Sequence, residues 1–112
     1  MLIGELSRRG GVSARSLRYY EQQGLLRSER LMNGYRDYDE DAVVVVRQIR
    51  ALMDAGFGSK DIAVLLPCAR GERPEIDICP DTLSTIRGAI DRVTAEAEEL
   101  RSHERSMARL LG

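Results

Sequence analysis

The sequence contains no tryptophan and only five aromatic residues among its 112 positions. Because large substrate pockets are usually lined by aromatic side chains, this scarcity favours binding through a surface over binding in an aromatic cavity. No apolar run approaches the ~20 residues of a membrane span, and Met1 leads directly into an amphipathic segment rather than a signal sequence. We therefore expect a cytoplasmic protein that does not enter a membrane.

Residues that carry catalysis or bind metals are also scarce. There is one histidine, His103, and the only cysteines are Cys68 and Cys79, with ten residues between them. This spacing is not a four-ligand zinc pattern, and no Ser/His/Asp or paired-carboxylate arrangement is present. A thiol oxidoreductase would present Cys-x-x-Cys at a helix start within a βαβ fold, and neither occurs here. We expect no enzyme, no cofactor and no metal site built by one chain alone.

The length fits one domain, or one small domain with an extended appendage. Residues 1–38 hold seven arginines and four acidic residues, a charge of +3, whereas residues 39–112 hold ten basic and fourteen acidic residues, a charge of −4. A basic head on an acidic body is the asymmetry expected when one face meets phosphate. All seven basic residues of the segment 1–38 are arginines, which form the bidentate contacts with phosphate and guanine that lysine cannot.

Two short helices joined by a glycine turn open the chain. The first is expected to end at Gly10-Gly11, and Ser13 is a good N-cap for a second helix over residues 14–23, with Gly24 as its left-handed stop. This arrangement predicts a helix-turn-helix unit. In the second helix Leu17 and Tyr20 face one way. The opposite face carries a polar, basic and aromatic stripe, as expected of a recognition helix in a major groove: Arg15, Arg18, Tyr19 and Gln22.

A hairpin is predicted next, around Asn33-Gly34. This dipeptide between extended segments is typical of a type I′ turn, which needs two positive φ values. Arg27, Arg30 and Arg36 crowd the hairpin, which suits a wing lying along a phosphate backbone.

Two further helices are expected after the wing. Asp39 can cap a third helix that ends at Gly56, and the run Val43–Val46 belongs to it despite a local preference for strand. Ser59 is expected to cap a short fourth helix that ends before Pro67.

The last segment is a long helix with a coiled-coil pattern. We divide the chain into a head at 1–66, a linker at 67–79 rich in glycine, proline and charge, and a dimerisation helix at 80–112. Apolar residues repeat at seam spacing over four heptads: Leu83, Ile86, Ile90, Val93, Ala97, Leu100, Met107 and Leu111. A helix of 30 residues is ~45 Å long, too long to bury its stripe on so small a head. A second copy is the simplest partner, and a helix folded back along the head is the alternative.

With these segments in order, the sequence resembles the mercury-resistance regulator (MerR) family. The resemblance is carried by Ile3-Gly4-Glu5-Leu6, Gly11-Val12-Ser13, Leu17-Arg18-Tyr19-Tyr20-Glu21, Gly24-Leu25-Leu26, Asn33-Gly34-Tyr35-Arg36 with Tyr38, Ile49 and Gly56-Phe57. It implies a mainly α fold: a winged helix-turn-helix head and an antiparallel coiled coil. It also implies a homodimer that binds a palindromic promoter element and distorts the DNA so that RNA polymerase engages it.

The resemblance assigns a DNA-binding surface residue by residue. Arg15 and Arg18 match base- and phosphate-reading positions, and the wing's Arg36 matches a backbone-contacting position, as do the tyrosines. A tyrosine such as Tyr20 can bury its ring and still extend its hydroxyl to a phosphate. The expected surface comprises Ser13, Arg15, Ser16, Arg18, Tyr19, Tyr20, Arg30, Asn33, Gly34, Tyr35, Arg36 and Tyr38. A DNA-bending architectural or excisionase-like protein, which shares the winged head, is the alternative function.

The signal that such a regulator senses is not evident from the sequence. Because the chain stops at Gly112, we expect no drug-binding domain. Cys79 matches a ligand position of the metal-sensing members, but their cysteines after the dimerisation helix have no counterpart here. Cys68 and Cys79 can be structural thiols, a redox-responsive pair, or a soft-metal site completed by a partner chain. They bracket the linker and are the only effector candidates that the sequence offers.

Overall fold

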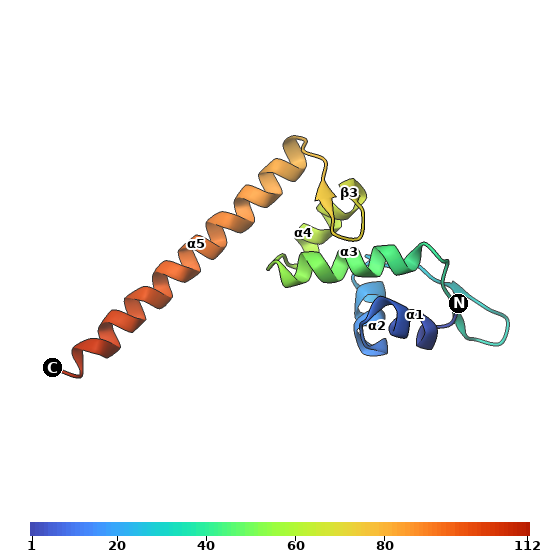
Figure 1. The fold of residues 1–112 in the computed structure, drawn as a ribbon, viewed down its shortest axis with the longest axis horizontal. Coiled ribbons are helices and arrows are strands. Elements are labelled where there is room, and N and C mark those ends of the chain that lie inside the picture. Colours follow the sequence, from blue (N-terminus) through green and yellow to red (C-terminus); the bar gives the residue numbers. More distant parts are fainter.

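The computed structural model describes all residues, Met1–Gly112, and shows a helical head from which one long helix extends (Figure 1). The molecule measures 67 × 35 × 21 Å along its principal axes. Its remaining regular structure is two separate antiparallel hairpins, so the predicted mainly α fold with a β-hairpin wing is confirmed.

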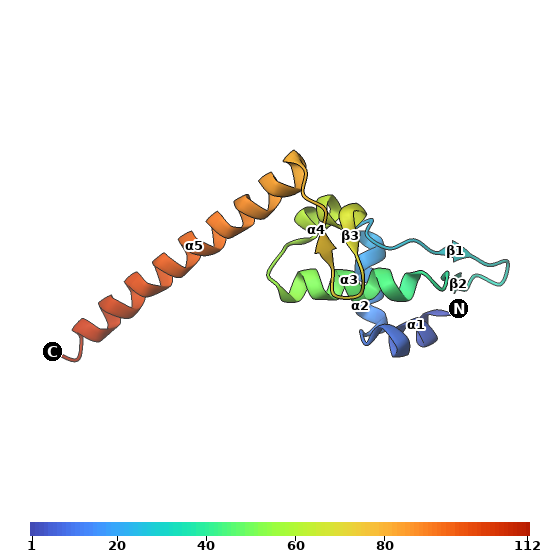
Figure 2. The ribbon, with the colours of Figure 1, turned by 45° about the horizontal axis from the view of Figure 1, so that its top comes forward.

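The elements follow the predicted order. The head holds helices α1 (Ile3–Gly10), α2 (Ala14–Gln22), α3 (Ala42–Asp54) and α4 (Ser59–Leu65), and a wing between α2 and α3 formed by β1 (Glu29–Arg30) and β2 (Arg36–Asp37). After α4 come a 3-10 turn η1 (Leu66–Cys68), a second hairpin of β3 (Ala69–Arg70) and β4 (Glu75–Ile76), and the long helix α5 (Pro80–Arg109). The wing projects from the head on the side away from the free end of α5 (Figure 2).

The core of the head lies where its four helices meet. Leu6 of α1, Leu17 of α2, Val46 of α3 and Ile62 of α4 are completely buried there. Helices α1 and α3 approach closely at Gly10, where an added Cβ would lie 2.7 Å from Cγ1 of Val46. This position therefore requires glycine, which leaves room for the neighbouring helix.

Two predicted helix caps are wrong. Helix α3 begins at Ala42 rather than just after Asp39, because residues 39–41 form a turn in which the Ala42 amide donates to the Asp39 carbonyl (3.0 Å). Ser59 is the first residue of α4 and not its cap, since its hydroxyl donates to Oε1 of Gln23 (3.1 Å). The run Val43–Val46 is helical as predicted.

The segment expected to be a linker contains the second hairpin, which is attached to α3. Nε2 of Gln48 donates to the Gly71 carbonyl (3.1 Å), and Nη1 of Arg47 lies 2.8 Å from Oε1 of Glu72. Strands of two residues are too short to show an alternating pattern, so they could not be predicted from the sequence.

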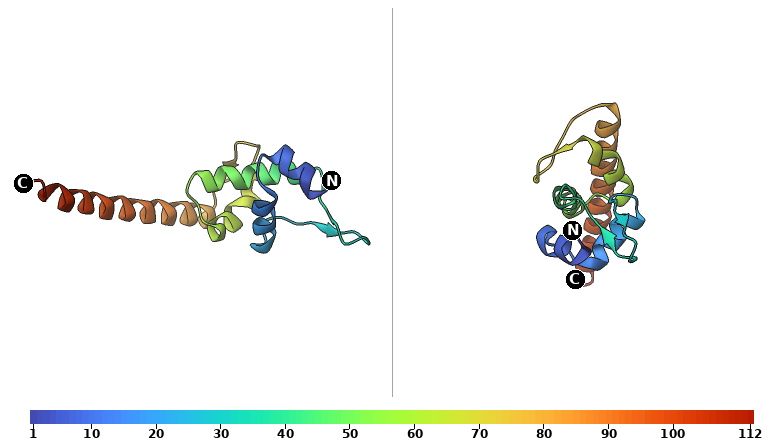
Figure 3. Two further views of the ribbon diagram at one scale, coloured as in Figure 1. Left: turned by 90° about the horizontal axis from the view of Figure 1, so that it is seen from below. Right: turned by 90° about the vertical axis from the view of Figure 1, so that its right-hand side faces the viewer.

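The first turns of α5 pack against the head, and the rest of the helix leaves it (Figure 3). Thr82 and Ala89 are buried, Ile86 packs on the core, and Nη1 of Arg92 lies 3.4 Å from Oδ2 of Asp61 on α4. From residue 93 onward every side chain except the half-buried Ala97 is exposed.

Candidate nucleic-acid interface

Helix α2 presents the polar stripe that the sequence predicted. Its N-terminus is capped by Ser13, whose Oγ accepts from the Ser16 amide at 3.0 Å. Leu17 is completely buried and Tyr20 is 5 % exposed, so the opposite face of the helix is held outward. That outward face carries the exposed side chains Arg15, Arg18, Tyr19 and Gln22.

Helix α3 holds the turn between α1 and α2. Nη1 of Arg50 donates to the Gly11 carbonyl (2.7 Å), and Nη2 of Arg47 donates to the Arg9 carbonyl (2.9 Å). These guanidinium groups satisfy carbonyls at the C-terminus of α1, which the helix itself leaves unpaired. Gly11 has a φ of +70° there, a conformation that favours glycine. Helix α3 therefore holds the turn that sets the direction of α2.

The wing turns through three residues and not through the predicted type I′ turn. The Leu31 amide donates to the Tyr35 carbonyl (2.7 Å) and the Gly34 amide donates to the Leu31 carbonyl (2.9 Å). Gly34 alone has a positive φ, +86°. A three-residue loop of this kind needs only one left-handed residue, so Asn33 keeps a negative φ, and its Oδ1 accepts from the Tyr35 amide (3.1 Å). Tyr35 is 63 % exposed near the tip.

An ion pair connects the wing to α2. Nε of Arg36 lies 3.0 Å from Oε2 of Glu21, and the Glu21 side chain is only 14 % exposed. A second attachment comes from the N-terminal amino group, which donates to Oδ1 of Asp37 (2.9 Å) and to the Tyr38 carbonyl (2.7 Å). The base of the wing is thus attached both to α2 and to the N-terminus. The Arg36 side chain belongs to the wing but points toward Glu21 of α2.

Two of the predicted contact tyrosines lie in the core. Tyr38 is 1 % exposed and its hydroxyl is buried without a hydrogen-bond partner, so the structure does not bring it to the surface that the resemblance implied. Burial, and then the charge of Glu21, raises the pKa of Tyr38. Tyr20 packs edge-on against Tyr19 with ring centroids 6.5 Å apart, and burial raises its pKa too.

The seven arginines of residues 1–38 fall into two groups. Arg8, Arg9 and Arg36 pair with carboxylates, and Arg9 holds the pKa of its partner Glu40 below the ordinary value. No carboxylate lies within salt-bridge distance of four others, two on α2 and two on the wing or leading to it: Arg15, Arg18, Arg27 and Arg30. All four are exposed. The arginine charge that residues 1–38 leave without an ion-pair partner is therefore located where the sequence predicted contact with phosphate.

The two cysteines lie near the joint between head and α5. Cys68 is half-buried, and its carbonyl accepts from the Asp77 amide (2.9 Å), two residues before the exposed Cys79. Hydrogen bonds from Thr82 lower the pKa of Cys79, which occupies the N-cap of α5. Both thiols are free, and no three potential metal ligands lie together.

The seam residues of α5 are placed unequally. Ile86 faces the head and Ala97 is half-buried. The others form an exposed apolar series along the helix: Leu83, Ile90, Val93, Leu100, Met107 and Leu111.

Sequence reasoning missed the residues that support this surface and the start of α5. Glu21, Arg47, Arg50 and Thr82 each bind a partner at another element or across a turn. Of these four residues, only Thr82 could have been predicted from the local sequence. A side chain three residues after an N-cap that bonds back to the N-cap amide is part of a capping box.

Comparison with known proteins identifies relatives over nearly the whole chain. Residues 1–68 match the MerR HTH family regulatory proteins. The HTH-type transcriptional regulator HmrR of Rhizobium leguminosarum bv. viciae is 38 % identical over 102 residues, which are 90 % of this chain and 78 % of HmrR. Nodulation protein NolA of Bradyrhizobium elkanii is 39 % identical over 100 residues, 88 % of this chain. The chain spans less than half the length of NolA, 44 %.

A solved structure is similar over the full length. The transcription regulator PbrR691 from Ralstonia metallidurans CH34, in complex with lead(II), superposes with a TM-score of 0.79 at 31 % identity, covering 98 % of this chain and 84 % of PbrR691. The relatives named here are regulators or a nodulation protein, which points to a non-enzymatic protein. No helix of the structure combines the length and apolar content that crossing a membrane requires.

Proposed function

The chain belongs to the MerR family of DNA-binding transcription regulators, and on that premise we propose that it binds a palindromic promoter element as a homodimer and acts by distorting the DNA. The observation that carries the proposal is the group of four exposed arginines without carboxylate partners on α2 and the wing. Family membership favours this reading over an architectural or excisionase-like protein.

The proposed DNA contacts divide by element. Arg15 and Arg18 would read base edges and phosphates from α2, while Arg30 and Tyr35 of the wing would lie along the backbone. Ser13, Ser16, Asn33 and Gly34 complete this surface, at the start of α2 and at the tip of the wing. Tyr20 and Arg36 contribute from positions that also stabilise the head.

The homodimer is proposed from α5. A monomer exposes Ile90, Val93, Leu100 and Met107 to water on one long helix. Burying such side chains stabilises association by about 1.5–3 kcal/mol for each one fully buried. An antiparallel pair of α5 helices would cover this series and place two heads at the ends of one dimer.

DNA distortion requires energy that a dimer can supply. Bending a site of promoter length costs about 1–6 kcal/mol by elastic estimates, and two heads double the phosphate contacts that offset this cost. RNA polymerase at the distorted promoter is the proposed partner. We place the protein in the cytoplasm, where promoter DNA and polymerase are.

One experiment tests the proposal. Genomic fragments selected on the purified protein would be footprinted with DNase I and then used as templates for in vitro transcription. We expect a footprint with two-fold symmetry, binding that weakens steeply with salt, and a changed transcript level. An asymmetric footprint, or DNA bending with no change in transcription on any template, would contradict the proposal.

A further inference from the structure

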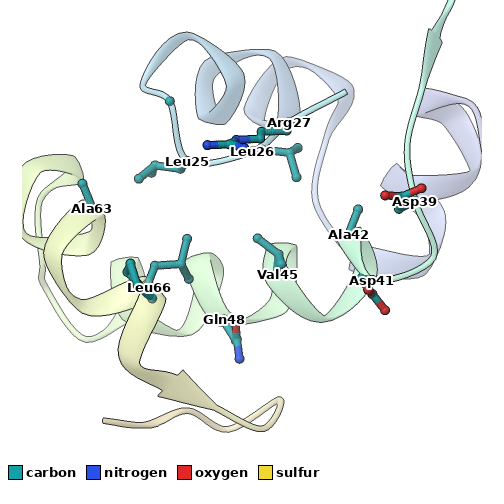
Figure 4. A pocket seen from close by; sticks show the side chains of 12 residues that line it. Leu25, Leu26, Arg27, Asp39, Asp41, Ala42, Val45, Gln48, Ala63 and Leu66 are labelled. Atoms are coloured by element: carbon teal, nitrogen blue, oxygen red, sulfur yellow. The ribbon is translucent and has the colours of Figure 1, made fainter. Parts of the chain in front are cut away.

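The head contains an apolar cavity beside the DNA-binding surface, with which it shares Arg27. Its volume is about 400 Å³, within the range of small-molecule sites. Figure 4 shows Leu25 and Leu26 on one side of it and Val45 and Leu66 on the other, with an open space between them. All four of these side chains are aliphatic. The scarcity of aromatic residues disfavours an aromatic cavity, but it does not bear on an aliphatic one.

Charged residues gather at one end of this cavity. Asp39 and Asp41 lie there beside Ala42, and Arg27 lies along the wall formed by Leu26 (Figure 4). None of these three charges has an ion-pair partner in the structure, and all three are exposed. The lining therefore has one negative charge in excess.

A second, smaller cavity of about 260 Å³ adjoins this end and shares Arg27 and Asp39 with the first. Its lining has no apolar residue, and it adds the carboxylates of Glu29 and Asp37 to that of Asp39. The N-terminal amino group pairs with Asp37, whereas Glu29 has no partner. An anion is therefore disfavoured at this end. A small metal ion is disfavoured too, because the apolar walls of the larger cavity offer it no ligands.

We propose that the larger cavity binds an amphiphilic organic cation, with its apolar body between Leu25 and Val45 and its ammonium group at the end marked by Asp39 and Asp41. The apolar walls remove the body from water, and the unpaired carboxylates select the positive charge. A neutral or anionic compound with the same apolar body gains the burial of that body but not the attraction of the carboxylates.

The position of the cavity gives such a ligand access to two parts of the head. One wall, Gly24–Arg27, joins α2 to the wing, and the other is formed by α3, α4 and η1, of which η1 directly precedes the second hairpin. Any effect of the ligand on DNA affinity rests on the proposed function, whereas binding itself does not.

Three probes that share one phenylbutyl body test the proposal on the intact protein: phenylbutylammonium, phenylbutanol and phenylpentanoate. Binding is followed by methyl NMR of labelled leucine and valine and by calorimetry. We expect the ammonium probe to shift the methyl signals of Leu25, Leu26, Val45 and Leu66 and to bind about fivefold more tightly than the alcohol, the size expected for two exposed ion pairs. The carboxylate probe should bind more weakly than either.

Variants separate the two contributions. The double substitution Asp39→Asn with Asp41→Asn should abolish the preference for the cation, whereas Asp91→Asn, an exposed carboxylate on α5 outside both cavities, should leave it unchanged. Ala63→Phe, which fills the cavity from the exposed face of α4, should abolish binding of all three probes. Thermal melts establish that each variant is folded before it is titrated.

Several results would overturn the proposal. Equal affinities of the three probes, or a cation preference that survives the double Asp→Asn substitution, would refute the ligand class. Methyl shifts confined to α5, or no binding at millimolar concentration, would refute the site. If a soluble paramagnetic agent fails to broaden the Val45 and Leu66 methyl signals of the protein alone, a segment of a second copy already fills the cavity and the proposal is wrong.

Discussion

Replacing Glu21 by glutamine tests whether the wing is held in place from α2. Glu21 is a poor candidate for a DNA contact because its side chain is 14 % exposed, and its Oε2 lies 3.0 Å from Nε of Arg36. Removing a negative charge near DNA also removes its Coulomb repulsion from the phosphates, and this effect alone would strengthen binding. If the carboxylate instead positions the wing, Glu21→Gln weakens binding. The two explanations predict opposite signs.

The magnitude follows from the partial burial of the pair. Exposed ion pairs contribute about 0.2–1 kcal/mol, and breaking a fully buried pair costs about 3–5 kcal/mol. The Arg36 side chain is 36 % exposed, so the pair lies between these limits. We expect Glu21→Gln to lower the free energy of unfolding by about 1–3 kcal/mol, and each kcal/mol lowers the melting temperature of a small domain by about 4–8 °C.

The assay is a double-mutant cycle with Glu21→Gln, Arg36→Gln and both together. Unfolding is measured at one protein concentration, because a dimer's stability depends on concentration. DNA affinity is measured at several salt concentrations. A coupling energy below about 0.5 kcal/mol, or a Glu21→Gln variant that binds DNA as tightly as the parent, would refute the positioning role. Glu5→Gln, an exposed carboxylate on α1 paired loosely with Arg8 (3.8 Å), is the matched control.

The remaining predictions concern the recognition helix, the dimer and the joint. Arg18→Ala should weaken operator binding by about 1–3 kcal/mol with little change in melting temperature, and a variant that binds normally but melts early would show Arg18 to be structural. Val93→Glu with Leu100→Glu should yield monomers that no longer bind the operator; sedimentation of the parent as a monomer at micromolar concentration would contradict this. Replacing Cys68 and Cys79 by serine should preserve operator binding and abolish any oxidant- or metal-dependent transcription, and a retained response would place the sensor elsewhere.

Much of the head could be predicted because local signals decide it. The Ser13 side chain caps α2, and Gly24 and Gly56 take positive φ where the helices end. Val43–Val46 is helical although β-branched residues favour strands, because this run continues a periodic apolar face into the core.

The remainder depends on contacts that sequence spacing does not encode. Whether Asn33 takes a positive φ depends on which wing residues pair, and Leu31 pairs with Tyr35 to leave a three-residue loop. Glu21 and Arg36 meet only because the wing folds back on α2. The aliphatic cavity arises where three separate segments fail to fill the space between them.

The docking of α5 on α4 gives the molecule a mechanical property. Thr82, Ala89 and Arg92 hold the first three turns of α5 against the head, so a tilt of this docked segment would carry the rest of the helix with it. A rotation of about 5° at this clamp displaces the far end of a ~45 Å helix by about 4 Å, comparable to the rise of one base pair. A sub-ångström shift beside Cys79 or Thr82 would therefore become a displacement of several ångströms at the far end of α5. In a dimer joined through two such helices, this displacement would change the relative orientation of the two recognition helices.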